Sequence, residues 1–429
     1  MVSQNPFTVG QPVPPERFVG RISQIATAFD QIHSRSNLAI WGGAGIGKSS
    51  FLELLTYPEV WQLQEQDPSN AVIVYLNCLS IIPFTPSRFW RKLLKLLQEK
   101  LDGNAAWQSV IDRILENTEV TREDIGSVLK KIGEQDKFLV LLLDDYDATL
   151  RTNAQYTEAD REIFLSECRD LAYHSEEKRF FSMIVASRRR LNEIGPKLTE
   201  ESSPWYNHYL FLPLKPFTKD EVVILLSGTL MTHELREGIS EIADGHPALL
   251  QNAAHLLYGK LRDRQTPNAE TFAREFLERT EQFFQDTWEL CNEVEQTLLM
   301  LVALSRLKGR LQNQGYDLGD IGIIFSQRER ELTDLEQRGV IKRSVDSDGT
   351  IYSFSSSIME WWVIKEIENS NEEGIQERQK MFLDLMSRKQ AERVKTVIRY
   401  LWEHRDDVKS MVEWIGKLAG AFPKGFFQG

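Results

Sequence analysis

A glycine-rich stretch at residues 41–50 decides the fold, and it reads Trp41-Gly42-Gly43-Ala44-Gly45-Ile46-Gly47-Lys48-Ser49-Ser50. Gly42 to Ser49 match the pattern G-x-x-x-x-G-K-[ST], in which glycines let backbone amides wrap closely around phosphate oxygens. Lys48 supplies a charge for the β- and γ-phosphates, and the Ser49 hydroxyl suits Mg²⁺. A short buried strand is expected before the loop and a helix after it, as in a phosphate-binding loop. A glycine turn that matches by accident would not explain these flanks, so the stretch predicts a nucleoside-triphosphate site.

The composition is that of a globular protein with several structural units. Of the 429 residues, 41% are hydrophobic and 27% are charged. This length exceeds one ordinary core, so we expect about two to four units. The formal net charge of −12 disfavours a protein whose main task is non-specific nucleic-acid binding. Cys78, Cys168 and Cys291 have no metal-like or paired spacing, which indicates reduced thiols packed as small apolar groups.

The sequence gives no signal for export or membrane insertion. Its N-terminus has neither the basic flank nor the apolar run of a signal peptide. The longest apolar runs, Phe138–Leu143 and Thr297–Leu304, are too short to cross a bilayer. We therefore expect a cytoplasmic protein with no membrane association.

A second chemical motif follows about a hundred residues after the loop, in Lys137-Phe-Leu-Val-Leu-Leu-Leu-Asp-Asp-Tyr-Asp147. Its apolar run is typical of a central parallel strand covered on both faces, and ligand sites lie at the carboxyl ends of such strands. Asp144 has the position of the residue that orients Mg²⁺, and Asp145 that of the residue that polarises an attacking water. The alternative is a strand that ends in a solvated Asp turn. Tyr146 and Asp147 are interpreted as loop residues.

Further apolar stretches predict the rest of one sheet. Residues 71–77, 180–187 and 209–214 read as buried strands separated by helical patterns. Strands that alternate with helices predict an α/β fold with a three-layer parallel sheet, and the glycine-rich loop makes this a P-loop NTPase domain. Arg188 follows the strand at 180–187, where it would reach a γ-phosphate. An arginine run such as 188–190 is as often a solvated surface.

The second half of the chain is predicted to be helical with one β-hairpin. A capping box from Thr218 to Glu221 opens a helix, and Gly245 and Pro247 suit the end of one helix and the first turn of the next. Three later helical patterns precede a hairpin that turns at 346–349, the order of a winged helix. We expect a P-loop ATPase domain at 1–214, a helical lid at 215–284, a winged helix at 285–370 and a helical tail at 371–429.

The order of these motifs resembles the STAND branch of P-loop ATPases, which includes NACHT and AP-ATPase proteins. It is also similar to the related origin-recognition-type AAA+ ATPases. The likeness covers roughly residues 5–367, and its opening is similar to a bacterial, often cyanobacterial, subset. The residues that carry it are Asn5-Pro-Phe7, Pro12-Val13, Phe18-Val-Gly-Arg21, Gly42–Ser50, the strand that ends in Asp144-Asp145, Ala186-Ser-Arg188 and Gly245-His-Pro247. No arginine follows Pro247 in its helix up to Leu250, which favours the STAND side.

The resemblance implies ATP or ADP with Mg²⁺ as ligands and assigns further residues to the site. Val19, Gly20 and Arg21 would line the adenine pocket, and Arg188 would sense the γ-phosphate. Pro247 lies in a G-x-P motif through which the lid and the winged helix respond to the nucleotide. Family members often carry an N-terminal effector and a C-terminal sensor array, which this sequence lacks. We therefore expect either a compact member that acts with a separately encoded effector or sensor protein, or a fragment.

Two functions of different classes remain open from the sequence. The leading hypothesis is a slow ATPase that works as a switch: ADP holds it closed, and ATP permits opening and homo-oligomerisation. The alternative is a DNA-handling ATPase whose winged helix binds the duplex. The helix before the hairpin mixes Arg328 and Arg330 with several carboxylates, so protein contacts are favoured over DNA. A metabolic phosphotransferase is disfavoured, because the sequence shows no acceptor-substrate signature.

Overall fold

The structure, a computed structural model, divides by its contacts into two compact units. We call Pro12–Gly42 with Gly47–Leu214 the sheet unit, and Met1–Gln11, Gly43–Ile46 and Lys215–Gly429 the helical unit. The residues described are 4–101, 105–196, 204–227, 229, 231–307, 318–346, 349–369, 372–403 and 410–427. Within these ranges no helix has the length and apolar character needed to cross a membrane.

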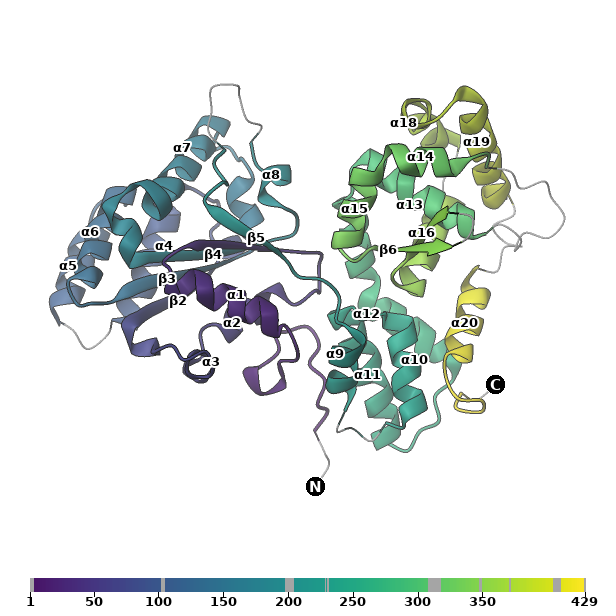
Figure 1. The fold of residues 1–429 in the computed structure, drawn as a ribbon, viewed down its shortest axis with the longest axis horizontal. Coiled ribbons are helices and arrows are strands. Elements are labelled where there is room, and N and C mark those ends of the chain that lie inside the picture. Colours follow the sequence, from purple (N-terminus) through teal and green to yellow (C-terminus); the bar gives the residue numbers. More distant parts are fainter. Residues whose placement is uncertain are drawn as a thin grey trace. The chain divides into compact units, whose positions relative to one another are not determined.

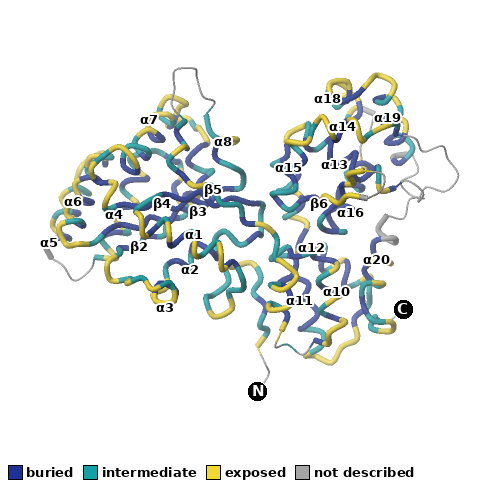
Figure 2. The backbone as a smooth tube through the Cα atoms, in the orientation of Figure 1, coloured by how far each residue is buried: buried dark blue, intermediate teal, exposed yellow. Residues whose placement is uncertain are grey.

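The sheet unit is built on five parallel strands in the order β2-β3-β4-β1-β5 (Figure 1). Their bounds are β1 Asn37–Trp41, β2 Ala71–Asn77, β3 Phe138–Asp144, β4 Phe181–Ser187 and β5 Tyr209–Pro213. All residues of the three central strands are buried, as their continuous apolar sequences predict (Figure 2). The predicted α/β class with a parallel P-loop sheet is confirmed.

Helices cover both faces of this sheet, which makes three layers. Alternate residues of β3, such as Leu139 and Leu141, pack in one apolar cluster with α4 and α6, whereas α1 and α2 contact β4 from the other face (Figure 1). The helix bounds are α1 Ile22–His33, α2 Lys48–Leu54, α3 Pro58–Leu63, α4 Pro86–Lys100, α5 Ala105–Leu115, α6 Arg122–Gly133, α7 Glu158–Arg169 and α8 Leu191–Ile194. Cys78, Cys168 and Cys291 are buried free thiols, as expected.

The helical unit begins with helices whose ends the sequence marks clearly. Thr218 and Glu221 form the predicted capping box of α9, and Pro247 is in the first turn of α11. The bounds are α9 Lys219–Leu226, α10 His233–Ala243, α11 Pro247–Arg262 and α12 Ala269–Glu289. α12 was not predicted, and it runs through the expected boundary between residues 284 and 285.

The later part of the helical unit contains the predicted β-hairpin after three helices. The bounds are α13 Glu293–Arg306, α14 Ile321–Gln327, α15 Glu329–Gln337, β6 Ile341–Asp346, β7 Gly349–Phe354, α16 Ser357–Glu368, α17 Glu372–Glu377, α18 Gln379–Leu385, α19 Arg388–Glu403 and α20 Ser410–Gly420. β6 and β7 pair antiparallel from Ile341 opposite Phe354 to Asp346 opposite Gly349. Two residues of its turn, 347 and 348, lie outside the described residues.

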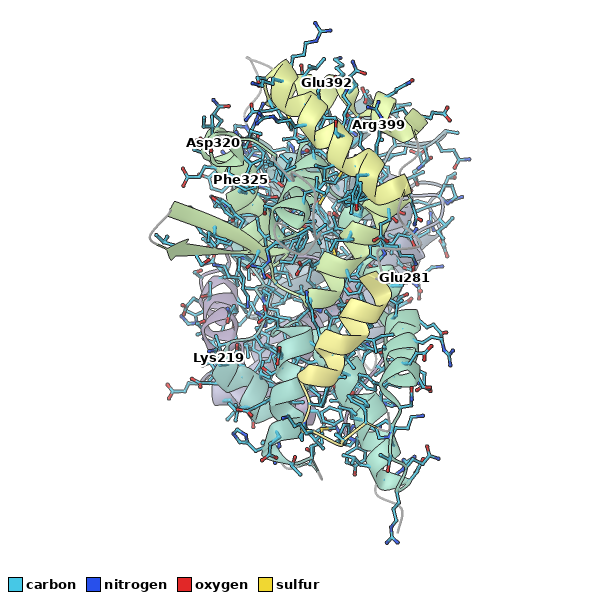
Figure 3. The ribbon with its side chains drawn as sticks, turned by 90° about the vertical axis from the view of Figure 1, so that its right-hand side faces the viewer. Lys219, Glu281, Asp320, Phe325, Glu392 and Arg399 are labelled. Carbon is cyan, nitrogen blue, oxygen red and sulfur yellow. The ribbon has the colours of Figure 1, made fainter. Side chains whose placement is uncertain are left out.

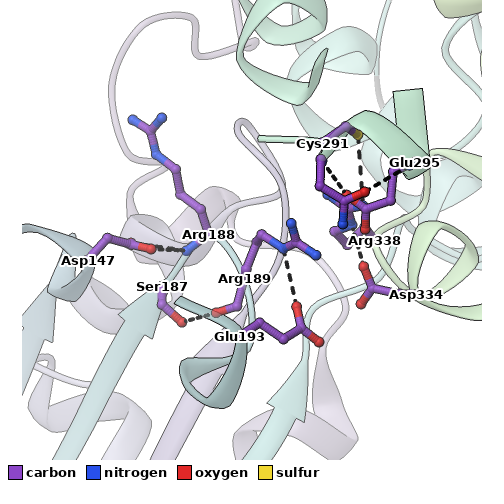
Figure 4. A network of polar contacts seen from close by, with 10 residues as sticks. Asp147, Ser187, Arg188, Arg189, Glu193, Cys291, Glu295, Asp334 and Arg338 are labelled. Atoms are coloured by element: carbon purple, nitrogen blue, oxygen red, sulfur yellow. Dashed lines mark hydrogen bonds and ion pairs between the residues drawn. The ribbon is translucent and has the colours of Figure 1, made fainter. Parts of the chain in front are cut away.

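The hairpin projects from the surrounding helices, as Figure 3 shows beside Phe325. Its base is held by Phe325 of α14, whose ring meets Tyr352 of β7 edge-on with centroids 5.4 Å apart. Buried ion pairs also stabilise this part of the helical unit. Arg338 donates to Glu295 Oε1 at 2.8 Å and pairs with Asp334 Oδ2 at 2.9 Å (Figure 4).

The N-terminal arm belongs to the helical unit. Phe7 is 4% exposed and packs edge-on against Tyr258 of α11. Asn5 Nδ2 donates to the carbonyl oxygen of His255 at 3.0 Å, and Thr8 N donates to Gln251 Oε1 at 3.0 Å. The contacts fall at positions 251, 255 and 258, which share one face of α11. Phe7 and these hydrogen bonds thus anchor the N-terminal arm to α11.

Candidate nucleotide-binding site

The glycine-rich loop joins β1 to α2 with backbone angles that require glycine. Gly45 has φ +72° and Gly47 has φ +98°, both in the left-handed region. A Cβ on Gly45 would lie 2.7 Å from Cβ of Ala248. α2 starts at Lys48, the residue directly after the second of these glycines. The sequence pattern therefore encodes a tight loop that turns into a helix at the lysine.

Lys48 is a half-buried cation with polar and acidic groups around it. Its Nζ donates to the carbonyl oxygen of Gly42 at 2.8 Å. Burial lowers the pKa of Lys48, and the carboxylates of Asp147, Asp144 and Asp145 oppose this change. Lys48 is thus within electrostatic range of three carboxylates at the end of β3, so the two sequence motifs belong to one site.

Asp144 is a buried carboxylate held by its neighbours. It is 2% exposed, and its Oδ2 accepts a hydrogen bond of 2.8 Å from the phenol of Tyr75. Its Oδ1 accepts from the backbone N–H of Asp145 at 3.0 Å. Burial and the charge of Asp144 raise the pKa of Tyr75, so the phenol remains a donor. These bonds fix the orientation of the carboxylate that the sequence assigns to Mg²⁺.

Asp145 occupies a strained turn immediately after β3. Its φ is +48°, which is uncommon for a residue other than glycine and is typical of functional turns. Asn77 Nδ2, from the end of β2, donates to Asp145 Oδ2 at 2.9 Å. Asn77 lies directly opposite Asp144 in the sheet register. The adjacent strand therefore orients both carboxylates, one through Tyr75 and one through Asn77.

The contacts of three residues of this site were not predicted from the sequence. Tyr75 and Asn77 are two positions apart on one strand, a spacing that places them on the same face, yet β2 was read only as a buried strand. Asp147 was interpreted as a loop residue. It does lie in the turn after β3, Tyr146–Leu150, but its contact with the next strand was not predicted: both of its carboxylate oxygens accept from the backbone N–H of Arg188, at 3.2 and 3.1 Å.

The arginines after β4 have separate surroundings (Figure 4). Arg188 bonds Asp147 through its backbone, while its side chain extends away from that carboxylate, and its charge contributes to lowering the pKa of Lys48. Arg189 pairs with Glu193 at 3.2 Å. Arg190 lies over the rings of Trp41 and Phe211, 5.4 and 5.8 Å from their centroids. The γ-phosphate role of Arg188 stays a prediction.

The predicted adenine-pocket residues form a sharp turn before α1. Gly20 has φ +69° and Arg21 has φ +60°, and Arg21 is 4% exposed. The carbonyl oxygen of Arg21 accepts from Ile25 N at 2.8 Å and starts the helix. Val13, further up this segment, donates its backbone N–H to Ser50 Oγ at 3.0 Å. Ser50 therefore anchors this segment to α2, and the adenine contacts of Val19, Gly20 and Arg21 stay predictions.

The tip of the loop, Gly43–Ile46, groups with the helical unit. There the carbonyl oxygen of Ala44 lies 3.1 Å from His246 Nε2, and that of Gly45 accepts from Ala248 N at 3.2 Å. His246 precedes Pro247 at the start of α11. The G-x-P segment predicted to respond to nucleotide thus contacts loop backbone within this unit, although the role of Pro247 itself stays a prediction.

Ser49 and Asp144 are the residues that would hold Mg²⁺ in this site. Among the described residues, no group of three or more His, Cys, Asp or Glu side chains could hold a metal ion by itself. Mg²⁺ is commonly bound by one or two protein groups together with phosphates and waters. The hydroxyl of Ser49 and the fixed carboxylate of Asp144 fit that pattern.

Comparison with known protein families matches residues 17–172 to the family described as AAA ATPase domain. This range contains the glycine-rich loop, Asp144, Asp145 and Asp147. No curated protein matches the chain.

Among solved structures, the Walker-type ATPase PABY2304 of Pyrococcus abyssi is similar in fold, with a TM-score of 0.52 and 18% identity over 83% of this chain and 99% of that one. The ORC2 protein of Aeropyrum pernix, in ADPNP-ADP complexes, matches with a TM-score of 0.49 and 13% identity over 86% of this chain and 99% of that one. Of these two similarities, only the first supports the fold. Residues 17–172 thus match the AAA ATPase domain family, and the chain has a P-loop fold with a parallel sheet that continues into a helical C-terminal region.

Proposed function

We propose that this protein binds ATP with Mg²⁺ at the glycine-rich loop and hydrolyses it slowly. The observation that carries the proposal is the electrostatic interaction of Lys48 with Asp144, Asp145 and Asp147 at the end of β3, in a segment that matches the AAA ATPase domain family. Lys48 would hold the β- and γ-phosphates, and Asp145 would polarise the attacking water. Ser49 and Asp144 would hold Mg²⁺, which neutralises phosphate charge when bound. Arg188 would contact the γ-phosphate.

We further propose that the activity serves a STAND-type signalling switch. The support is that the loop tip bonds the start of α11 through His246 and Ala248, so phosphates wrapped by the loop would change these contacts. A ligand shifts such an equilibrium only through contacts that differ between the two states. ADP would keep the closed arrangement, and ATP would favour an open form that assembles with further copies. A separately encoded effector or sensor is the expected partner.

We propose that α13, α14, α15 and the hairpin form a winged helix that contacts protein rather than DNA. Its basic residues are largely engaged by carboxylates. Lys342 pairs with Asp244, Arg343 with Glu329 at 3.0 Å, and Arg328 with Glu331 at 3.4 Å. A surface that reads DNA presents basic side chains to phosphates. We also propose the division into a P-loop ATPase domain at 1–214, a helical lid at 215–284, a winged helix at 285–370 and a helical tail at 371–429.

The test is Mg²⁺-dependent phosphate release from ATP, together with affinity for a fluorescent ATP analogue. Wild type should bind and hydrolyse. Lys48→Ala should lose affinity about a hundredfold, because it removes a charge-assisted contact to phosphate. Asp67→Asn is the control. Like the site carboxylates, Asp67 accepts a hydrogen bond from a backbone N–H, that of Ser69, but it lies before the start of β2, whereas the site lies at the carboxyl ends of the strands. Normal affinity in Lys48→Ala would exclude this site.

A further inference from the structure

The turn that follows β3 brings Asp147 back to the carboxyl end of the sheet. Asp145 adopts a left-handed conformation, and the chain then forms a short 3-10 turn, Tyr146–Leu150. Ala148 N donates to the carbonyl oxygen of Asp145 at 2.9 Å and closes this turn. As a result the side chain of Asp147, three residues beyond the strand, reaches the end of the neighbouring strand β4.

At that end, Asp147 holds one particular peptide group. Both of its carboxylate oxygens lie within 3.2 Å of the backbone nitrogen of Arg188 (Figure 4). On the other side of the same peptide, the carbonyl oxygen of Ser187 accepts from Gly42 N at 3.2 Å. The Ser187–Arg188 peptide is therefore fixed between Asp147 and the first glycine of the loop.

The connection continues to the loop lysine. Gly42 N bonds Ser187 O, and the carbonyl oxygen of Gly42 accepts from Lys48 Nζ at 2.8 Å. Asp147 also acts on Lys48 through space, since its charge is the strongest of the carboxylate contributions that favour the ammonium form. Burial raises the pKa of Asp147, while Lys48 and the N–H of Arg188 counter that change. One carboxylate thus faces both the lysine and the backbone that carries Arg188.

We propose that Asp147 is a positioning residue for ATP hydrolysis, which fixes the Ser187–Arg188 peptide and thereby sets where the Arg188 side chain begins. This inference rests on the proposed ATPase function and assigns no direct contact between Asp147 and the nucleotide. A misplacement of about 1 Å at such a group can cost up to a hundredfold in rate. Asp147→Asn removes the charge and replaces one carboxylate oxygen by an NH₂ group. At that position two N–H donors, the amide of the new side chain and the backbone N–H of Arg188, would face each other.

A double-mutant cycle with Arg188→Ala separates this role from a purely structural one. The steady-state kcat and KM for ATP are measured in wild type, Asp147→Asn, Arg188→Ala and the double variant, with Asp67→Asn as control. We expect Asp147→Asn to lower kcat about tenfold, with KM within about threefold of wild type. In the Arg188→Ala background, the same substitution should change kcat less than twofold, because the group that it positions is gone.

Two results would overturn the proposal. A kcat within about twofold of wild type in Asp147→Asn would show that the peptide needs no such anchor. Equal losses in both backgrounds would show that Asp147 acts independently of Arg188. If wild type does not hydrolyse ATP, the ATPase proposal fails by itself. The double-mutant cycle is then measured by binding, as the ratio of the affinity for an ATP analogue to the affinity for ADP. Asp147→Asn should then reduce this ratio as Arg188→Ala does, and an unchanged ratio would reject the positioning role.

Discussion

The phenol of Tyr75 donates a hydrogen bond of 2.8 Å to Oδ2 of Asp144, across adjacent strands of the sheet. Asp144 is the residue proposed to hold Mg²⁺, so Tyr75 would support that site through Asp144. Partners of this kind typically contribute tenfold to a hundredfold to metal affinity.

Tyr75→Phe tests this support, because it removes the hydroxyl and keeps the ring. We expect the Mg²⁺ concentration for half-maximal ATP hydrolysis to rise about tenfold, while the maximal rate at saturating Mg²⁺ changes little. Titration of Mg²⁺ at saturating ATP measures both quantities. An unchanged Mg²⁺ requirement would mean that the Tyr75–Asp144 bond serves stability alone.

Asp145→Asn should separate binding from chemistry. Asp145 is oriented by Asn77 at 2.9 Å and is proposed to act on the attacking water. Loss of a general base typically lowers kcat by about two to four orders of magnitude, whereas affinity for ATP should stay within a few-fold. Single-turnover hydrolysis and analogue binding, compared with Asp67→Asn, provide the readout. A variant with normal kcat would remove Asp145 from the mechanism.

The arm at the N-terminus should stabilise the helical unit through one side chain. Phe7→Ala removes a ring that is 4% exposed and in contact with Tyr258, so the free energy of unfolding should fall by about 3–5 kcal/mol. Thr8→Ala is the control, because Thr8 contacts Gln251 through its backbone N–H. Urea unfolding followed by circular dichroism compares the two variants. Equal midpoints for both would show that the arm does not stabilise the folded unit.

The side chain of His208 should make the free energy of unfolding of the sheet unit decrease at acidic pH. Burial, with Arg169 and His174 nearby, lowers the pKa of His208 to about 3. The unfolded chain has a histidine pKa of about 6.5 and so binds a proton first as pH falls. Stability is therefore full above about pH 6.5 and is lost progressively towards pH 3, by about 1–2 kcal/mol at pH 5. His208→Gln should remove this part of the slope in urea unfolding. The same slope in both proteins would assign it to other groups.

The sequence was sufficient for the elements whose signals are local. The apolar run before Asp144, the glycine-rich loop and the hairpin at 341–354 each combine composition with turn residues in one short stretch. The 21-residue helix α12 was overlooked, although its buried positions, such as Phe272, Phe276 and Phe284, recur at helical spacing. Its many charged residues between these positions obscured the apolar face.

The site was predictable only where its residues are adjacent in sequence. Asp147 lies forty-one positions before Arg188, and Tyr75 lies sixty-nine before Asp144. These pairs depend on strand order and register, since β3 lies between β2 and β4 in the sheet. A left-handed Asp145 turns Asp147 back onto the sheet, and a single sequence does not specify that backbone conformation for a residue other than glycine.

We propose that ATP, but not ADP, changes the state of this protein through the glycine-rich loop. The most direct measurement is molar mass by light scattering, for wild type and Lys48→Ala, with ADP or a non-hydrolysable ATP analogue, with and without duplex DNA. We predict a larger assembly of wild type with the ATP analogue alone and no change in Lys48→Ala. An identical mass with both nucleotides, or assembly only when DNA is present, would contradict the switch.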